Sequence, residues 1–161
     1  MMLDATAGNR MMWPNKNPPN IIFIDREIRL LISPHVFADF RFCPFRKDVF
    51  DCIIFDPPHL IKKGGPMPWF SDPSKVGNKW YGNFDNKIEC LTSIHKAQKE
   101  FNRIGKRLCF KWNESSISLW NILPFFKDWQ IIRKKHHKSK YQRGKNPTWW
   151  ITFIRKEAEA Q

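Results

Sequence analysis

The sequence lacks several features that would assign the protein to familiar classes. Its four cysteines, Cys43, Cys52, Cys90 and Cys109, form no CxxC pair and have no metal-ligand spacing, so we expect reduced, structural thiols and no metal site. No apolar run approaches the ~18 residues that a transmembrane helix needs. No basic segment followed by an apolar one opens the chain. We therefore expect a soluble cytoplasmic protein without membrane contact.

Acidic residues are also scarce. The 161 residues include 28 Lys and Arg but only 15 Asp and Glu, which gives a net charge of +13 at pH 7. This excess favours a polyanionic partner, most often nucleic acid, although an anionic membrane surface or solubility alone would also suit it. The length predicts a single domain over 1–156, followed by a short tail at 157–161.

The sequence does contain a recurring unit, a short apolar run that ends in an acidic residue. These runs end at Asp4, Asp25, Asp39 and Asp56. Continuous apolar runs are typical of strands covered on both faces, which predicts a mostly parallel sheet in an α/β sandwich. Open parallel sheets bind ligands outside the carboxyl ends of their strands. The four acids would therefore share one rim of the sheet.

Further elements are predicted along the rest of the chain. Apolar residues at helical spacing indicate a helix over 85–104, capped by Asp85 and followed by Gly105. The other predicted elements are a strand at 107–112, a helix at 115–126 interrupted near Pro124, and strands at 129–133 and 149–155. The last two strands suit an antiparallel hairpin at one edge of the sheet. Three prolines between 8 and 20 disfavour a crossover helix, so we expect trimmed N-terminal crossovers.

Two stretches, LDATAGNRMMW at 3–13 and FDPPH at 55–59, together resemble the class I S-adenosylmethionine-dependent methyltransferases. The similarity is to the amino-methyltransferases of nucleic-acid bases, whose fourth motif is Asp, Asn or Ser, two prolines and an aromatic residue. Small phage-type and prokaryotic DNA adenine methylases that end this motif in His look most similar. The resemblance implies a compact Rossmann-like domain, S-adenosylmethionine as cofactor, and methylation of adenine N6 in DNA, in the host cytoplasm if the gene is a phage's.

The resemblance also implies cofactor-binding residues. The turn Asp4, Ala5, Thr6, Ala7 and Gly8 would approach the methionyl part of the cofactor, since its small residues leave room and Gly8 can take a positive φ. The family's usual second glycine is missing, because Asn9 and Arg10 follow Gly8.

Two later segments complete the implied cofactor site. Asp25 lies near the ~20-residue spacing at which an acid meets ribose hydroxyls, and Asp39 and Phe40 would contact the adenine amine and ring. Each strand-end acid has an alternative role as an ordinary helix cap.

FDPPH supplies the predicted catalytic residues. Asp56 and the carbonyl of Pro57 can accept hydrogen bonds from an exocyclic amine, while Pro57 and Pro58 fix the backbone in an extended pose. His59 occupies the position at which relatives stack an aromatic side chain on the extruded base. Alternatively, DPP taken alone is a turn that ends a strand.

Two segments are predicted to contact nucleic acid. A substrate loop over 60–84 combines lysines with aromatic residues, and a basic hairpin over 133–146 contains no acid. The candidate residues are Lys62, Lys63, Trp69, Lys79, Trp80, Tyr81, Arg133, Lys134, Lys135, Lys138, Lys140, Arg143 and Lys145. The alternatives are a packed Ω-loop that covers the core and a solvated charge run.

Target specificity and substrate remain open at this point. The chain has no room for a separate target-recognition domain, so specificity would come from the loop, the hairpin, a second copy in a homodimer, or a partner subunit. RNA would suit the charge and the aromatic residues as well as DNA. A catalytically idle nucleic-acid-binding subunit is a second alternative, and methylation of a protein or small-molecule amine would leave the basic hairpin unexplained.

Overall fold

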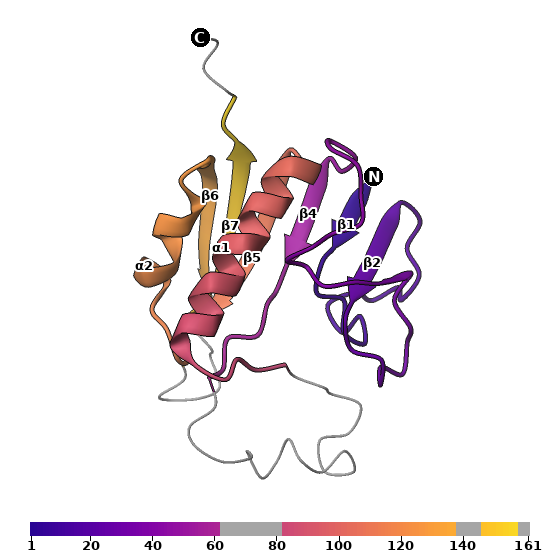
Figure 1. Cartoon of the computed structure of the whole chain (residues 1–161), viewed down its shortest axis with the longest axis horizontal. Coiled ribbons are helices and arrows are strands. Elements are labelled where there is room, and N and C mark those ends of the chain that lie inside the picture. The colour runs from indigo at the N-terminus through magenta and orange to yellow at the C-terminus, as the bar shows by residue number, and fades with distance from the viewer. Residues whose placement is uncertain (62–81, 138–145, 158–161) are drawn as a thin grey trace.

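A computed structural model describes residues 1–61, 82–137 and 146–157, which form one seven-stranded sheet (Figure 1). Its strands are β1 (Met2–Asp4), β2 (Ile21–Asp25), β3 (Val36–Phe37), β4 (Cys52–Phe55), β5 (Arg107–Asn113), β6 (Trp129–His137) and β7 (Thr148–Arg155). Their order is β3-β2-β1-β4-β5-β7-β6. Strands β1 to β5 are parallel, and β7 runs antiparallel to both β5 and β6. The predicted Rossmann-like α/β sheet with an antiparallel C-terminal pair is confirmed.

Helices cover one face of this sheet. The long helix α1 (Lys87–Ile104) lies across β4 and β5 in Figure 1, and the short helices α2 (Leu119–Ile122) and η1 (Leu123–Phe126) follow β5. Phe101 of α1 packs on Phe55, with 4.8 Å between ring centroids, and Phe126 of η1 packs on Phe110 at 5.1 Å. Because Phe55 and Phe110 point to the same side of neighbouring strands, all three helices share that side.

Several element boundaries differ from the predicted ones. Helix α1 begins at Lys87, and its cap is Asn86 rather than Asp85, because the Asn86 side chain accepts a hydrogen bond of 2.9 Å from the Glu89 amide. Strand β3 ends at Phe37, and α2 begins only at Leu119. Strand β6 continues to His137, so the first part of the predicted basic hairpin tip belongs to a strand. No helix in the described ranges is long and apolar enough to cross a membrane.

The three N-terminal crossovers, over 5–20, 26–35 and 38–51, contain no helix, which the prolines had predicted for the first of them. The first is held by Arg10, which is buried and has a φ of 53°. The Arg10 guanidinium donates to the carbonyls of Lys16 at 2.6 Å and Ser33 at 2.7 Å, and lies 4.2 Å from the Phe23 ring centroid. Asn9 accepts a hydrogen bond of 2.8 Å from the Leu31 amide. The two residues after Gly8 therefore tie neighbouring loops together.

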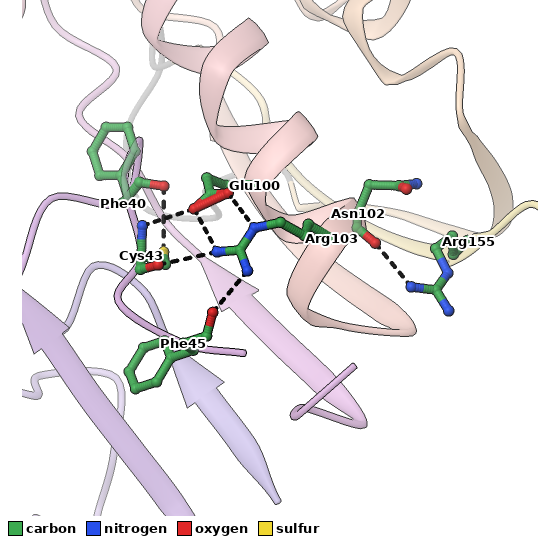
Figure 2. Close-up of polar contacts among 7 residues, drawn as sticks. All are labelled: Phe40, Cys43, Phe45, Glu100, Asn102, Arg103 and Arg155. Atoms are coloured by element: carbon green, nitrogen blue, oxygen red, sulfur yellow. Dashed lines mark hydrogen bonds and ion pairs between the residues drawn. The ribbon is translucent and has the colours of Figure 1, made fainter. Parts of the chain in front are cut away.

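The third crossover is attached to α1 by hydrogen bonds between its backbone and two paired side chains of the helix. Figure 2 shows Arg103 reaching from the helix to the carbonyls of Phe45 and Cys43, at 2.7 and 3.1 Å. Glu100 pairs with Arg103 at 2.6 Å and accepts from the Cys43 amide at 2.9 Å. This network fixes the segment that carries Phe40, whose ring packs on the buried Phe55.

Candidate functional site

A cavity of about 470 Å³ opens at the carboxyl ends of β1, β2 and β4. Its wall includes the Asp4–Gly8 turn, Asp25, Phe40 and the segment from Asp56 to His59. The Asp56 amide donates to the Thr6 hydroxyl at 2.8 Å, which joins two motifs that lie 50 positions apart in the sequence. Small-molecule sites commonly occupy roughly 300–1,000 Å³. The cavity therefore has the size and the position expected for a ligand site at the edge of a parallel sheet.

Gly8 and Asp25 form one side of the cavity. Gly8 has a φ of +49°, a left-handed conformation that favours glycine. Its amide donates to Asp25 Oδ2 at 2.8 Å, and the Glu27 amide donates to Asp25 Oδ1 at 2.9 Å. A carboxylate offers about four lone-pair sites. Asp25 is thus held in a fixed orientation while it keeps acceptor capacity toward the cavity.

Asp4 lies at the base of the turn and is buried. Burial raises its pKa to about 6, although hydrogen bonds from the Trp13 indole at 2.7 Å and the Thr6 amide at 3.1 Å act in the opposite direction. The negative charges of Asp56 and Asp25 contribute to the increase. Three carboxyl groups therefore lie close enough to interact at one edge of the sheet, although the protein as a whole is strongly basic.

Asp56 forms an ion pair that the sequence analysis did not predict. Lys111 on β5 places its Nζ 2.6 Å from Asp56 Oδ2, and both side chains are partly exposed. The sequence feature that could have pointed to Lys111 is a lysine between two apolar residues of a strand, Phe110 and Trp112, which are both buried. Burial also lowers the pKa of His59, and nearby Lys111 lowers it further, while Asp56 opposes the shift. The neutral imidazole is therefore the favoured form of His59.

Asp39 occupies a different position from the other predicted acids. It does not line the cavity, although its neighbour Phe40 does. Its carboxylate pairs with Arg41 at 2.6 Å and with Arg26 at 3.7 Å. Burial would raise the pKa of Asp39, but the hydrogen bonds from Arg41 outweigh it and hold that pKa below its ordinary value. The side chain is therefore engaged in stabilising its own loop.

Only part of the predicted nucleic-acid contact surface can be located. The ends of the predicted substrate loop lie side by side, because the Phe84 amide donates to the Leu60 carbonyl at 3.0 Å. Arg133, Lys134 and Lys135 lie on β6. The other candidates fall outside the described residues: Lys62, Lys63, Trp69, Lys79, Trp80, Tyr81, Lys138, Lys140, Arg143 and Lys145. Within the described ranges, His, Cys, Asp and Glu side chains form no group of three that could hold a metal ion.

Comparisons with known proteins support the fold alone. No family model matches the chain, and no curated protein matches it. Among solved structures, the chain is similar to the crystal structure of the PH0226 protein from Pyrococcus horikoshii OT3. The TM-score is 0.64 at 10% sequence identity, over 96% of this chain and 81% of that one. The shared architecture therefore extends over nearly the whole chain.

Proposed function

We propose that the protein is an S-adenosylmethionine-dependent methyltransferase that acts on the exocyclic amine of a nucleic-acid base, adenine N6 in DNA above all. The observation that carries this proposal is the cavity at the carboxyl edge of the sheet, in which the turn after β1 and the DPPH segment after β4 form one wall. The first motif would then face the cofactor, and the second would face the target amine. We also propose that the protein acts in the cytoplasm.

The residues around the cavity fit the proposed cofactor. The left-handed turn at Gly8 has open space where a Cβ would lie, so the backbone leaves room for a ligand. Asp25 offers carboxylate oxygens to ribose hydroxyls, and Phe40 offers an apolar ring beside the cavity. The carboxyl groups of Asp4, Asp25 and Asp56 interact electrostatically, which suits a ligand that carries a sulfonium cation.

The chemistry required of the protein is then mainly orientation. The cofactor supplies a methyl group already activated by its positive sulfur. Asp56 and the Pro57 carbonyl would accept hydrogen bonds from the amine, which aims the nitrogen lone pair at the methyl carbon. Transfer would form the nitrogen–carbon bond and break the sulfur–carbon bond, and the amine would lose one proton. The Asp56 carboxylate and the neutral His59 imidazole would be the proton acceptors at this end of the cavity.

Lys111 sets the starting state of this reaction. Its ammonium group occupies Asp56 Oδ2 at 2.6 Å, so an incoming amine must use Oδ1 or displace the lysine. In a duplex the target base would also have to leave the helical stack to reach this position.

Calorimetric titration with S-adenosylmethionine tests the cofactor step. We expect the wild-type protein to bind and the Asp25→Asn variant to bind at least tenfold more weakly, a loss of about 1.4 kcal/mol. The exposed Asp128→Asn variant has the same change in charge away from the cavity and should bind as the wild type does. A wild-type dissociation constant weaker than about 1 mM would refute the proposed enzyme and favour an idle binding subunit.

Transfer of a labelled methyl group tests the substrate step. Unmethylated DNA and RNA oligonucleotides of the same sequence would be compared, followed by identification of the labelled base. We expect label on adenine in DNA, and loss of transfer but not of cofactor binding in Asp56→Ala. Label entering RNA alone would replace DNA with RNA as the substrate, and undiminished transfer by the Asp56→Ala variant would remove the assigned role of Asp56.

A further inference from the structure

On the second face of the sheet, four strands have no covering element among the described residues, and we call this region the open face. The connection over 5–20 covers this face at β1 and β2, where Ala7 and Trp13 pack against Phe23. Over β4, β5, β7 and β6, no described helix lies on it, because Phe101 and Phe126 both pack on the opposite face.

The open face is basic and contains an aromatic side chain. In the strand register, Lys111 and Lys135 are both paired with Trp150, so the three side chains form one row across β5, β7 and β6. Lys111 Nζ lies 5.8 Å from the centroid of the Trp150 ring. Arg133, Lys135 and Trp150 line a surface hollow of about 300 Å³. None of these three strands contains an acidic residue.

The basic residues of β6 divide between the two faces of the sheet. Lys134 points to the helical face, where its Nζ lies 4.5 Å from the Trp120 ring centroid and 4.6 Å from that of Trp149. His136 stacks on Trp149 with 4.4 Å between centroids. Arg133 and Lys135 alternate with these residues and point to the open face. On one face the basic run therefore contacts aromatic rings near the surface, and on the other face its cations have no such aromatic contacts.

The open face leads directly to the candidate site. Asp56 follows β4 on the same side as Cys52 and Ile54, which are the β4 residues that point away from the helices. Lys111 belongs both to the row on the open face and to the wall of the cavity, and its ammonium group pairs with Asp56. A ligand that lies across β6, β7 and β5 thus ends at the DPPH segment.

We propose that this open face is the docking surface for a nucleic-acid strand, with phosphates on Arg133 and Lys135 and a base stacked on Trp150. The charge of β6 and β7 carries the choice of occupant, because neither strand contains an acid and their cations suit a polyanion, and the indole offers a surface on which any base can stack. The inference rests on the proposed function, since it supplies the path by which a target base reaches Asp56.

The test measures binding of a fluorescent single-stranded oligonucleotide by anisotropy, without cofactor, over a series of salt concentrations. The open-face variant is Arg133→Gln with Lys135→Gln. The matched control is Lys87→Gln with Lys99→Gln, which removes the same charge from exposed positions on α1. We expect at least tenfold weaker binding for the open-face variant and a salt slope smaller by about 1.4, as for two lost phosphate contacts. The control should stay within about twofold of the wild type, because only distant charge is lost.

A second variant tests the stacking contact. Trp150→Leu retains an apolar side chain and should weaken binding about tenfold or more while leaving the salt slope unchanged, because no cation is removed. Its thermal unfolding is compared with that of the wild type. Trp150→Phe restores an aromatic surface and should recover most of the affinity, which a purely structural role for Trp150 would not predict.

Several outcomes would overturn the docking surface. An equal loss of affinity in the open-face variant and in the α1 control variant would show that only net charge matters. Absence of wild-type binding at low salt would refute the docking surface. Binding to anionic phospholipid vesicles in place of oligonucleotides, with the same dependence on Arg133 and Lys135, would assign the face to a membrane. Because binding is measured without cofactor, a failed methyl-transfer assay leaves this result intact, and the two proposals fail separately.

Discussion

Replacement of the buried Asp4 by asparagine should change how the stability of the fold depends on pH. Burial raises the pKa of Asp4 from an ordinary value of 3.8 to about 6. The folded state therefore binds a proton more tightly than the unfolded state does, and stability falls as pH rises through the interval between the two values. At about 1.4 kcal/mol per pKa unit, the loss amounts to about 3 kcal/mol by pH ~7.

The Asp4→Asn variant isolates this contribution because asparagine does not titrate. The amide can accept from the Trp13 indole or from the Thr6 amide but not from both, which adds a penalty of about 1–3 kcal/mol that does not vary with pH. We therefore expect the free energy of unfolding of the wild type to fall by about 3 kcal/mol relative to the variant between about pH 4 and pH 8.

Urea unfolding followed by tryptophan fluorescence measures this difference at each pH. Asp51→Asn is the matched control, because a hydrogen bond from the N-terminal amine lowers the pKa of Asp51. The stability that Asp51 contributes is complete above the ordinary carboxyl pKa and is lost only at lower pH. The free energy of unfolding of this control should therefore change with pH as that of the wild type does across the interval. A constant difference between the wild type and Asp4→Asn would refute the argument from burial.

Two further predictions concern the core and the open face. Gly105→Ala should destabilise the fold by about 1–3 kcal/mol in urea unfolding, because the new Cβ would lie 2.6 Å from Cδ1 of the fully buried Ile53. A variant as stable as the wild type would show that Ile53 can shift to make room for the methyl group. A hydrogen bond with Cys52, at an Sγ–Sγ distance of 3.7 Å, lowers the pKa of Cys109, so Cys109 should react with iodoacetamide at a lower pH than an ordinary thiol does. Cys52→Ala should move the midpoint of that reaction to higher pH, and an unchanged midpoint would exclude the thiol pair as the cause.

The strands were predictable because each apolar run is short and is ended by a residue that cannot continue it. Asp4, Asp25 and Asp56 follow such runs, and the structure brings all three to the cavity. Asp39 follows a run of the same kind, but β3 stops at Phe37 and the carboxylate pairs with Arg41 instead. The ion pair with Arg41 holds the Asp39 carboxylate in its own loop, and the spacing of the acids in the sequence does not predict that pair.

The features that the sequence did not predict depend on contacts between residues that lie far apart in the chain. Strand β6 extends through its basic residues to His137 because β7 supplies backbone partners over that length, whereas propensity alone would have ended the strand sooner. Lys111 was missed because its role comes from Asp56, which lies 55 positions earlier in the chain. The open face was not predicted from the sequence, because its basic row depends on the register of three strands.

The helix-free connections also divide the molecule into parts that should open at different free energies. The wall of the cavity over 5–20 and 38–45 is held by individual side chains such as Arg10 and Arg103, whereas β4, β5 and β7 are held by continuous ladders under α1. Local openings need only break the weaker set, so amide hydrogen exchange in the wall should outpace exchange in the central strands. A ligand could then enter through motions of the wall while the sheet that carries Asp56 stays intact.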